Sequence, residues 1–184
     1  MDIPYTQQFS VKQTPLGTLL PILRQHAGDR GKLRTAFASA FFKGTKSSEK
    51  IAGNTLIALK AHGIIESNGD LTPFGRTLIN LTSEEAEIEI ARNLLKNLGG
   101  FQVVETLREM KKGGHDLSLV SVTAELKSRG LTVSENSSDL SGVRGWLEAA
   151  GVLNGWEVLE DQYAKIIGAE AKTIDALKDL TIAQ

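Results

Sequence analysis

Cationic, hydroxyl and amide side chains gather between residues 43 and 54, in the stretch Lys-Gly-Thr-Lys-Ser-Ser-Glu-Lys-Ile-Ala-Gly-Asn. The amide of Asn54 can pair in a bidentate manner with adenine, and the ammonium groups of Lys46 and Lys50 suit guanine edges or phosphates. The chemistry on offer here is recognition through hydrogen bonds and positive charge, and it requires that these side chains share one exposed surface.

Residues that could carry catalysis are sparse. The histidines His26, His62 and His115 lie far apart without metal-ligand spacing, and we expect them to be surface or cap residues. The absence of cysteine excludes disulfides, thiolate metal sites and a cysteine nucleophile. Gly99-Gly100 and Gly113-Gly114 lack the spacing of a phosphate-cradling loop. We therefore expect no catalytic residue, no metal and no cofactor.

One pattern keeps a catalytic alternative open. Asp116 followed by Glu125-Leu126-Lys127 resembles the metal-binding pattern of one nuclease superfamily, in which the Glu-x-Lys part lies on a strand. In such enzymes the carboxylates hold a divalent metal and the lysine aids the attacking water. Val120 and Val122 are compatible with a strand, but the segment occupies the place of a helix in an internal repeat, so we favour a helix.

Helical periodicity and capping signals predict five helices in the first half. Ser47 is expected to cap the third of them by accepting hydrogen bonds from free backbone N–H groups, and Gly63 ends it. Thr82-Ser83-Glu84-Glu85 is a capping box that begins the fifth. Asn68-Gly69 lies between short β-prone runs and predicts a hairpin. The predicted helices are 16–26, 33–42, 47–62, 77–81 and 82–98, with a turn at 28–31.

The second half repeats this plan at a constant offset of 88 residues, which predicts two domains, 1–98 and 99–184. A second hairpin is expected around Asn154-Gly155, and Trp146 and Trp156 are expected in the core. The predicted helices are 101–112, 116–129, 138–150, 160–167 and 170–180. The corresponding pairs are Leu59 with Leu147, Gly63 with Gly151, Ile64-Ile65 with Val152-Leu153, Leu71 with Leu159, and Leu78-Ile79 with Ile166-Ile167.

Two short motifs resemble winged-helix regulators. Leu59-x-x-x-Gly63-Ile64-Ile65 is similar to the end of the recognition helix and its passage into the wing, and Leu71-Thr72-Pro73-Phe74-Gly75-Arg76 is similar to the exit from the wing. Residues 147–153 repeat the first motif, whereas residues 159–163 lack the Gly-Arg of the second. The resemblance implies a mainly α fold with short β-hairpin wings (α+β), built as two winged-helix domains in tandem.

The resemblance also implies double-stranded DNA as partner, because the recognition helix of such a module lies in the major groove with its N-terminal half at the base edges. Asn68, at the wing tip, could reach the adjacent minor groove, and the cations before the helix would contact the DNA backbone. The expected DNA-binding residues of the first domain are Lys32, Arg34, Lys43, Thr45, Lys46, Ser47, Ser48, Lys50, Asn54 and Asn68.

The second domain offers a less basic surface at the equivalent helix. Its candidate DNA-binding residues are Ser138, Ser141 and Arg144, beside Ser137 and Asp139. Serine and aspartate can read bases but release no counterions. This domain could read DNA through polar side chains, bind a protein, or brace the first domain.

The charge distribution supports a polyanion partner for the first part of the chain. Residues 1–76 hold ten Lys or Arg and five Asp or Glu, a charge of +5. Residues 77–184 hold eleven Lys or Arg and seventeen Asp or Glu, a charge of −6. The two charges sum to the net charge of −1. No signal peptide is visible, and no apolar stretch reaches the roughly 20 residues that span a bilayer. We expect a cytoplasmic protein with no membrane partner.

Tandem winged helices are similar in architecture to the target-recognition portions of some modular restriction endonucleases. We therefore expect sequence-specific DNA binding by the recognition module of a larger restriction-type nuclease with a fused catalytic domain. The end of the chain, residues 176–184, has the pattern of a helix about to continue, which favours a longer parent. The alternatives are a free-standing winged-helix regulator that forms a homodimer through residues 82–98, and a protein-interaction adaptor without DNA binding.

Overall fold

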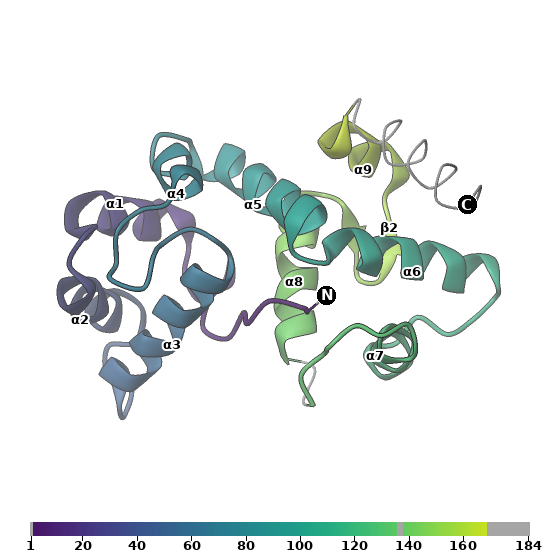
Figure 1. Ribbon diagram of the computed structural model, residues 1–184, viewed down its shortest axis with the longest axis horizontal. Coiled ribbons are helices and arrows are strands. Elements are labelled where there is room, and N and C mark those ends of the chain that lie inside the picture. Colours follow the sequence, from purple (N-terminus) through teal and green to yellow (C-terminus); the bar gives the residue numbers. More distant parts are fainter. Residues whose placement is uncertain (1, 136–137, 169–184) are drawn as a thin grey trace.

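The computed structural model describes residues 2–135 and 138–168, and within them the fold is mainly helical with one small antiparallel sheet (Figure 1). This confirms the predicted fold class at that level. No helix of the described part is long and apolar enough to cross a membrane. The predicted helix 170–180 lies outside the described residues. The elements are α1 (Leu16–His26), α2 (Arg30–Phe41), α3 (Ser48–Ala61), α4 (Pro73–Leu78), α5 (Ser83–Asn97), α6 (Gly100–Lys112), α7 (Leu119–Ser128), α8 (Ser138–Ala149), β1 (Leu153–Asn154), β2 (Glu157–Val158) and α9 (Glu160–Ile167).

Capping side chains begin two helices earlier than the hydrophobic periodicity predicted. The Asp29 carboxylate accepts a hydrogen bond from Lys32 N over 3.0 Å, so α2 begins at Arg30, inside the predicted turn 28–31. Thr72 Oγ1 accepts from Gly75 N over 3.0 Å, so α4 spans residues 73–78 instead of 77–81. In both places the polar cap, and not the first apolar residue, defines the helix start.

Helix α5 joins the two halves of the molecule. Its capping box is confirmed: Thr82 Oγ1 accepts from Glu85 N over 3.2 Å, and Glu85 Oε2 accepts from Thr82 N over 2.9 Å. The helix packs against α1 on one side and against α6, α8 and α9 on the other (Figure 1). The buried side chains are Ala86, Ile90, Ala91, Leu94 and Leu95.

The passage from the third helix of each half into its hairpin is built in the same way. Ile64 N donates to Leu59 O over 2.9 Å after α3, and Val152 N donates to Leu147 O over 2.8 Å after α8. The chain then turns through glycines with positive φ, a conformation that favours glycine. These glycines are Gly63 and Gly151.

The two hairpins differ by one residue. In the first, Glu66 N donates to Asp70 O over 2.8 Å across a three-residue loop. In the second, Asn154 pairs with Glu157 across the two residues Gly155 and Trp156. The correspondence between the halves therefore changes from 88 to 87 residues, and Leu71 corresponds to Val158 instead of the predicted Leu159.

The first hairpin is reduced to a single β-bridge, between Ile65 and Leu71. Its loop lies against the turn between α1 and α2: Gly28 N donates to Gly69 O over 2.9 Å, and Arg30 Nη1 donates to Ser67 O over 3.1 Å. The α1–α2 turn donates hydrogen bonds to these two loop carbonyl groups. The loop therefore does not depend on a longer pair of strands to satisfy them.

The N-terminal segment, residues 2–14, runs between the two halves (Figure 1). Thr55 Oγ1 of α3 donates to Gln8 O over 2.8 Å. On the other side, Thr6 N donates to Asp139 Oδ1 of α8 over 2.8 Å, and Trp146 Nε1 donates to Phe9 O over 3.1 Å. The segment thus contacts both halves, whose buried side chains form one continuous hydrophobic cluster.

Candidate nucleic-acid interface

Helix α3 has one buried face and one exposed face. Each residue advances about 100° around the helix axis, which places Lys50 and Ile57 opposite the buried residues. Lys50 is exposed and 47% of the Ile57 side chain is accessible. Tight packing on the other face fixes the rotation of α3, so these positions are held toward solvent. The residues packed inward are Ala52, Thr55, Leu56, Ala58 and Leu59.

An open hollow of about 420 Å³ lies along this exposed face, between α2 and α3. Three of the sequence-predicted residues, Arg34, Lys50 and Asn54, line it together. The Arg34 guanidinium lies 3.8 Å from the point where a Cβ would stand on Gly53, so α2 lays a cation across α3. The remaining lining residues are Arg30, Glu49, Gly53 and Ile57.

Sequence reasoning missed Arg30 and Ile57. The sequence places Arg30 in the predicted turn 28–31, whereas it is the first residue of α2. Ile57 falls outside the polar stretch 43–54, but it lies seven residues after Lys50 and therefore two turns along the same face. On a helical wheel of residues 47–62, Ile57 falls on the same face as Lys50.

The loop from α2 to α3 carries Thr45, Lys46 and Ser47 at the surface, with Ser48 half-buried. Ser47 is the N-cap residue, but its φ is +66° and its side chain makes no capping hydrogen bond, so the expectation that it caps α3 is wrong. A left-handed backbone turns the hydroxyl away from the first-turn N–H groups, whereas capping serines have extended backbones.

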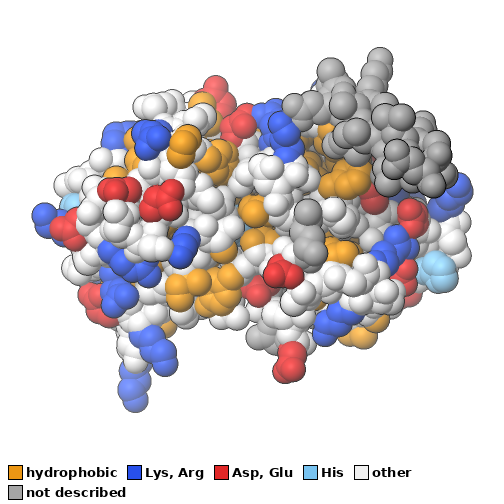
Figure 2. All heavy atoms as spheres, in the orientation of Figure 1, with side chains coloured by type: hydrophobic (Ala, Val, Ile, Leu, Met, Phe, Trp, Pro, Cys, Tyr) orange, Lys and Arg blue, Asp and Glu red, His pale blue; other side chains and the backbone are white. Residues whose placement is uncertain are grey.

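The cations of this surface have no acidic partners. No carboxylate of the described residues lies within 4.0 Å of the charged groups of Arg34, Lys43, Lys46 or Lys50. In Figure 2, Lys and Arg side chains gather over and below α3, in the lower part of the first half. Glu49 also lines the hollow, so its charged lining is three cations, Arg30, Arg34 and Lys50, against one carboxylate, and such an excess of positive charge favours a polyanion.

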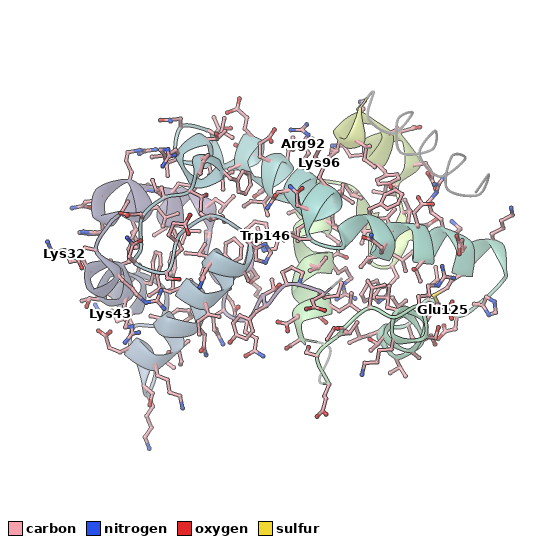
Figure 3. The ribbon with its side chains drawn as sticks, viewed as in Figure 1. Lys32, Lys43, Arg92, Lys96, Glu125 and Trp146 are labelled. Atoms are coloured by element: carbon pink, nitrogen blue, oxygen red, sulfur yellow. The ribbon has the colours of Figure 1, made fainter. Side chains whose placement is uncertain are left out.

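Two predicted residues stand apart from this cluster. Lys32 pairs with Asp29 over 3.5 Å and lies beside His26 and Thr35, on another face of α2 (Figure 3). Asn68 Nδ2 donates to Asp70 Oδ2 over 2.7 Å, and Asn68 Oδ1 accepts from Asp70 N over 3.0 Å. The Asn68 amide is therefore already used to shape its own loop.

The equivalent surface of the second half is neutral. Ser138 and Ser141 border a shallow hollow with Gln7 and Gln13 of the N-terminal segment, and Gln7 Nε2 donates to Ser138 Oγ over 3.3 Å. Arg144 lies over the Trp156 ring, 4.8 Å from its centroid. This surface offers hydrogen bonds and little free charge.

Asp139 is buried and accepts the hydrogen bond from Thr6 N. Its carboxylate therefore fixes the N-terminal segment, contrary to the expectation that it could read a base. The predicted core positions of Trp146 and Trp156 are confirmed, since both side chains are buried.

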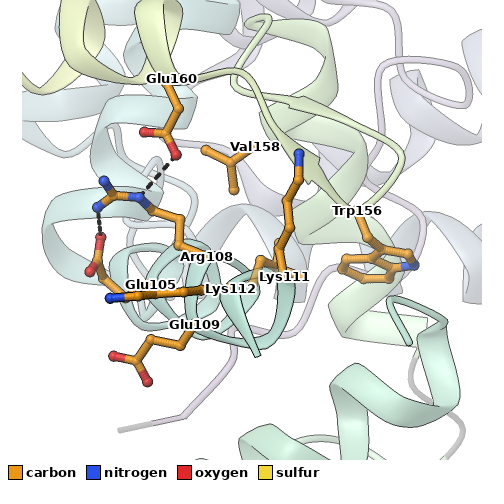
Figure 4. A pocket seen from close by; sticks show the side chains of 9 residues that line it. Glu105, Arg108, Glu109, Lys111, Lys112, Trp156, Val158 and Glu160 are labelled. Carbon is orange, nitrogen blue, oxygen red and sulfur yellow. Dashed lines mark hydrogen bonds and ion pairs between the residues drawn. The ribbon is translucent and has the colours of Figure 1, made fainter. Parts of the chain in front are cut away.

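Three cations elsewhere in the second half, Arg108, Lys111 and Arg129, are paired with carboxylates. Around the hollow lined by α6, β2 and Glu160, Arg108 bonds to Glu105 over 2.8 Å and to Glu160 over 3.0 Å (Figure 4). The Glu105 carboxylate raises the pKa of Arg108. Lys111 pairs with Glu157 over 2.6 Å and lowers the pKa of that carboxyl. The hollow therefore holds carboxylates beside its cations, whereas Arg34, Lys43, Lys46 and Lys50 have no carboxylate within 4.0 Å among the described residues.

The nuclease pattern is not on a strand. Glu125 and Lys127 lie on the helix α7 (Figure 3), so the favoured helix is confirmed and the strand alternative is wrong. Glu125 pairs with Arg129 over 2.8 Å, and Asp116 Oδ2 accepts from Ser121 Oγ over 3.0 Å. Within residues 2–135 and 138–168, no three acidic or histidine side chains gather as a metal site would require.

His62 follows α3 as its C-cap residue, but it is buried and not at the surface. Thr6 Oγ1 donates to Pro4 O over 2.8 Å, so the 3.2 Å contact between Thr6 Oγ1 and His62 Nε2 requires a hydrogen on Nε2. Burial lowers the pKa of His62 to about 3. The ring is a neutral packing element between the halves.

Comparison of the chain with protein-family models, with curated proteins and with solved structures finds no match.

Proposed function

We propose that the protein binds double-stranded DNA through the exposed face of α3, and that its halves are winged-helix units in tandem. One observation supports this proposal above the others: four cations without acidic partners surround a helix whose opposite face is locked into the core. A helix fits the major groove of B-form DNA, and flanking cations release counterions from the phosphates. The cations are Arg34, Lys43, Lys46 and Lys50.

The two units would contribute unequally. In Figure 1 the N-terminal ends of α3 and α8 are both their lower ends, and we propose that both face the same duplex. The first unit brings charge, which sets affinity, and the second brings serine and glutamine side chains, which add hydrogen bonds without counterion release. The footprint on DNA would therefore be asymmetric: binding by the first unit would depend strongly on salt, and binding by the second unit would depend on it weakly.

A narrower proposal is that this chain is the recognition module of a larger restriction-type nuclease, acting in the cytoplasm. Its neutral second unit fits a reader of sequence better than a binder of any duplex. The regulator alternative needs a dimer and a palindromic site, so a monomer in sedimentation at binding concentrations favours the module. The adaptor alternative predicts no DNA binding that depends on salt.

The test is selection of bound duplexes from a random pool, followed by anisotropy titrations across a salt series. We expect the logarithm of affinity to fall linearly with the logarithm of salt concentration, and Lys50→Ala to reduce that slope by about 0.9 if the residue contacts one phosphate. Lys127→Ala, an exposed lysine on α7, is the matched control and should leave the slope unchanged. Affinity that is absent or independent of salt would overturn the proposal.

A further inference from the structure

We infer that Ile57 contacts the 5-methyl group of a pyrimidine in the major groove, so that the α3 surface distinguishes methylated from unmethylated pyrimidine rings. This inference rests on the proposed function and names the chemical group that the same surface reads. Thymine and 5-methylcytosine both present this methyl group.

The position of Ile57 carries the inference. Among the described residues, three large hydrophobic side chains are exposed: Ile57, Val120 and Leu159. Ile57 alone of the three lines the cationic hollow, together with Arg30, Arg34 and Lys50. An apolar side chain within such a surface gains free energy on binding only if the partner offers an apolar group there.

Charge complementarity selects the partner. The cations of this surface fit a polyanion, and a protein partner that covered Ile57 would have to be strongly acidic. In the major groove of DNA, the apolar group that base edges present is the 5-methyl of thymine. A 5-methylcytosine places the same group at the same ring position.

The neighbours of Ile57 fit a base edge. Asn54 precedes it by three residues, a spacing that puts two side chains on one helix face. Its amide can read adenine, whose partner thymine carries the methyl group in the same groove. Gly53 beside them has no side chain, and the three atoms nearest the position of its missing Cβ, at 3.8 to 3.9 Å, belong to Arg34. A duplex that approaches this part of the hollow would therefore meet the Arg34 guanidinium beside Gly53.

The experiment starts from a duplex selected by the wild-type protein. Each thymine is replaced in turn by uracil, which deletes the methyl group and keeps the pairing, and each cytosine is replaced by 5-methylcytosine. Burial of one methyl group predicts about a fourfold change in affinity at one position. A loss with uracil assigns the contact to thymine, and a gain with 5-methylcytosine assigns it to a methylated cytosine.

Ile57→Ala should abolish the difference between methylated and unmethylated duplexes while salt-dependent binding persists. Val120→Ala, a substitution at another exposed helical residue, should preserve the difference. The inference is overturned, but not the proposed function, if the wild-type affinity does not depend on any methyl group. The same holds if the affinity difference between methylated and unmethylated duplexes persists in Ile57→Ala. Self-association that Ile57→Ala abolishes would mean that a second copy covers this residue, and would also overturn it. Absence of any duplex binding overturns both proposals.

Discussion

Gly53 lies inside α3 although glycine disfavours helices by about 0.5–1 kcal/mol relative to alanine. The three atoms nearest to a Cβ there would be Arg34 side-chain atoms at ordinary contact distance, so packing does not require glycine. We predict that Gly53→Ala raises the free energy of unfolding by about 0.5–1 kcal/mol and weakens duplex binding, because its methyl group enters the hollow. Denaturant titration and anisotropy measure the two effects.

The matched control is Gly145→Ala in α8, where a Cβ would have no atom within 4 Å. It should stabilise the protein to a similar degree and leave the affinity for DNA nearly unchanged, because the second unit contributes little charge. If both variants bind the duplex as the wild type does, the hollow beside Gly53 does not accommodate DNA.

The neutral state of His62 makes stability depend on pH. The folded-state pKa is about 3, against 6.5 for an ordinary histidine. Between these values the unfolded chain binds the additional proton, so the stability due to neutral His62 is fully present above pH 6.5. It is lost at up to about 1.4 kcal/mol per unit as pH falls toward 3. Denaturation at pH 7.5 and at pH 5 should show this loss.

His62→Gln removes the titrating group, and its stability should change less between the two pH values even if the variant is weaker overall. The control is His115→Gln, since His115 is exposed and its substitution should preserve the pH dependence. An equal pH dependence in wild type and His62→Gln would show that carboxylates, and not this histidine, produce the effect.

At the scale of elements, the sequence predicted segments with strong periodicity or a complete cap. Helix α1 has the predicted bounds, and α5 begins at the predicted capping box. The failures were at polar boundaries, where Asp29 and Thr72 cap helices before their first apolar residue. The hairpin predicted at Asn68-Gly69 is present, but its pairing is limited to the bridge between Ile65 and Leu71, and its loop bonds to the α1–α2 turn, a tertiary contact that no local pattern predicts.

The same distinction holds for the candidate site. Lys50 and Asn54 were expected on an exposed helical face because their spacing is local, and they lie there. Arg30 and Ile57 join them through the packing of α2 beside α3, which no local pattern contains. The burial of Asp139 likewise depends on the N-terminal segment, more than 130 residues away along the chain.

At the scale of the whole molecule, the N-terminal segment couples the halves. The Phe9 ring lies 4.9 Å from the His62 ring and 4.7 Å from the Trp146 ring, which Figure 3 shows at the junction. The two tryptophans of the chain, Trp146 and Trp156, both belong to the second half. Tryptophan fluorescence therefore reports on that half, whereas the proposed DNA contacts belong mainly to the first.

We predict a single unfolding transition in which tryptophan fluorescence and far-ultraviolet circular dichroism coincide. Phe9→Ala should lower the free energy of unfolding by about 3–5 kcal/mol, as for other buried phenylalanines. A selected duplex at 100 times its Kd should raise the free energy of unfolding measured by fluorescence by about 2.7 kcal/mol, because binding to one half stabilises everything that unfolds with it.

Phe41→Ala, within α2, is the control that perturbs the first half without the junction. Its fluorescence transition should still coincide with that of circular dichroism. If the duplex leaves the midpoint of the fluorescence transition unchanged, the halves unfold independently.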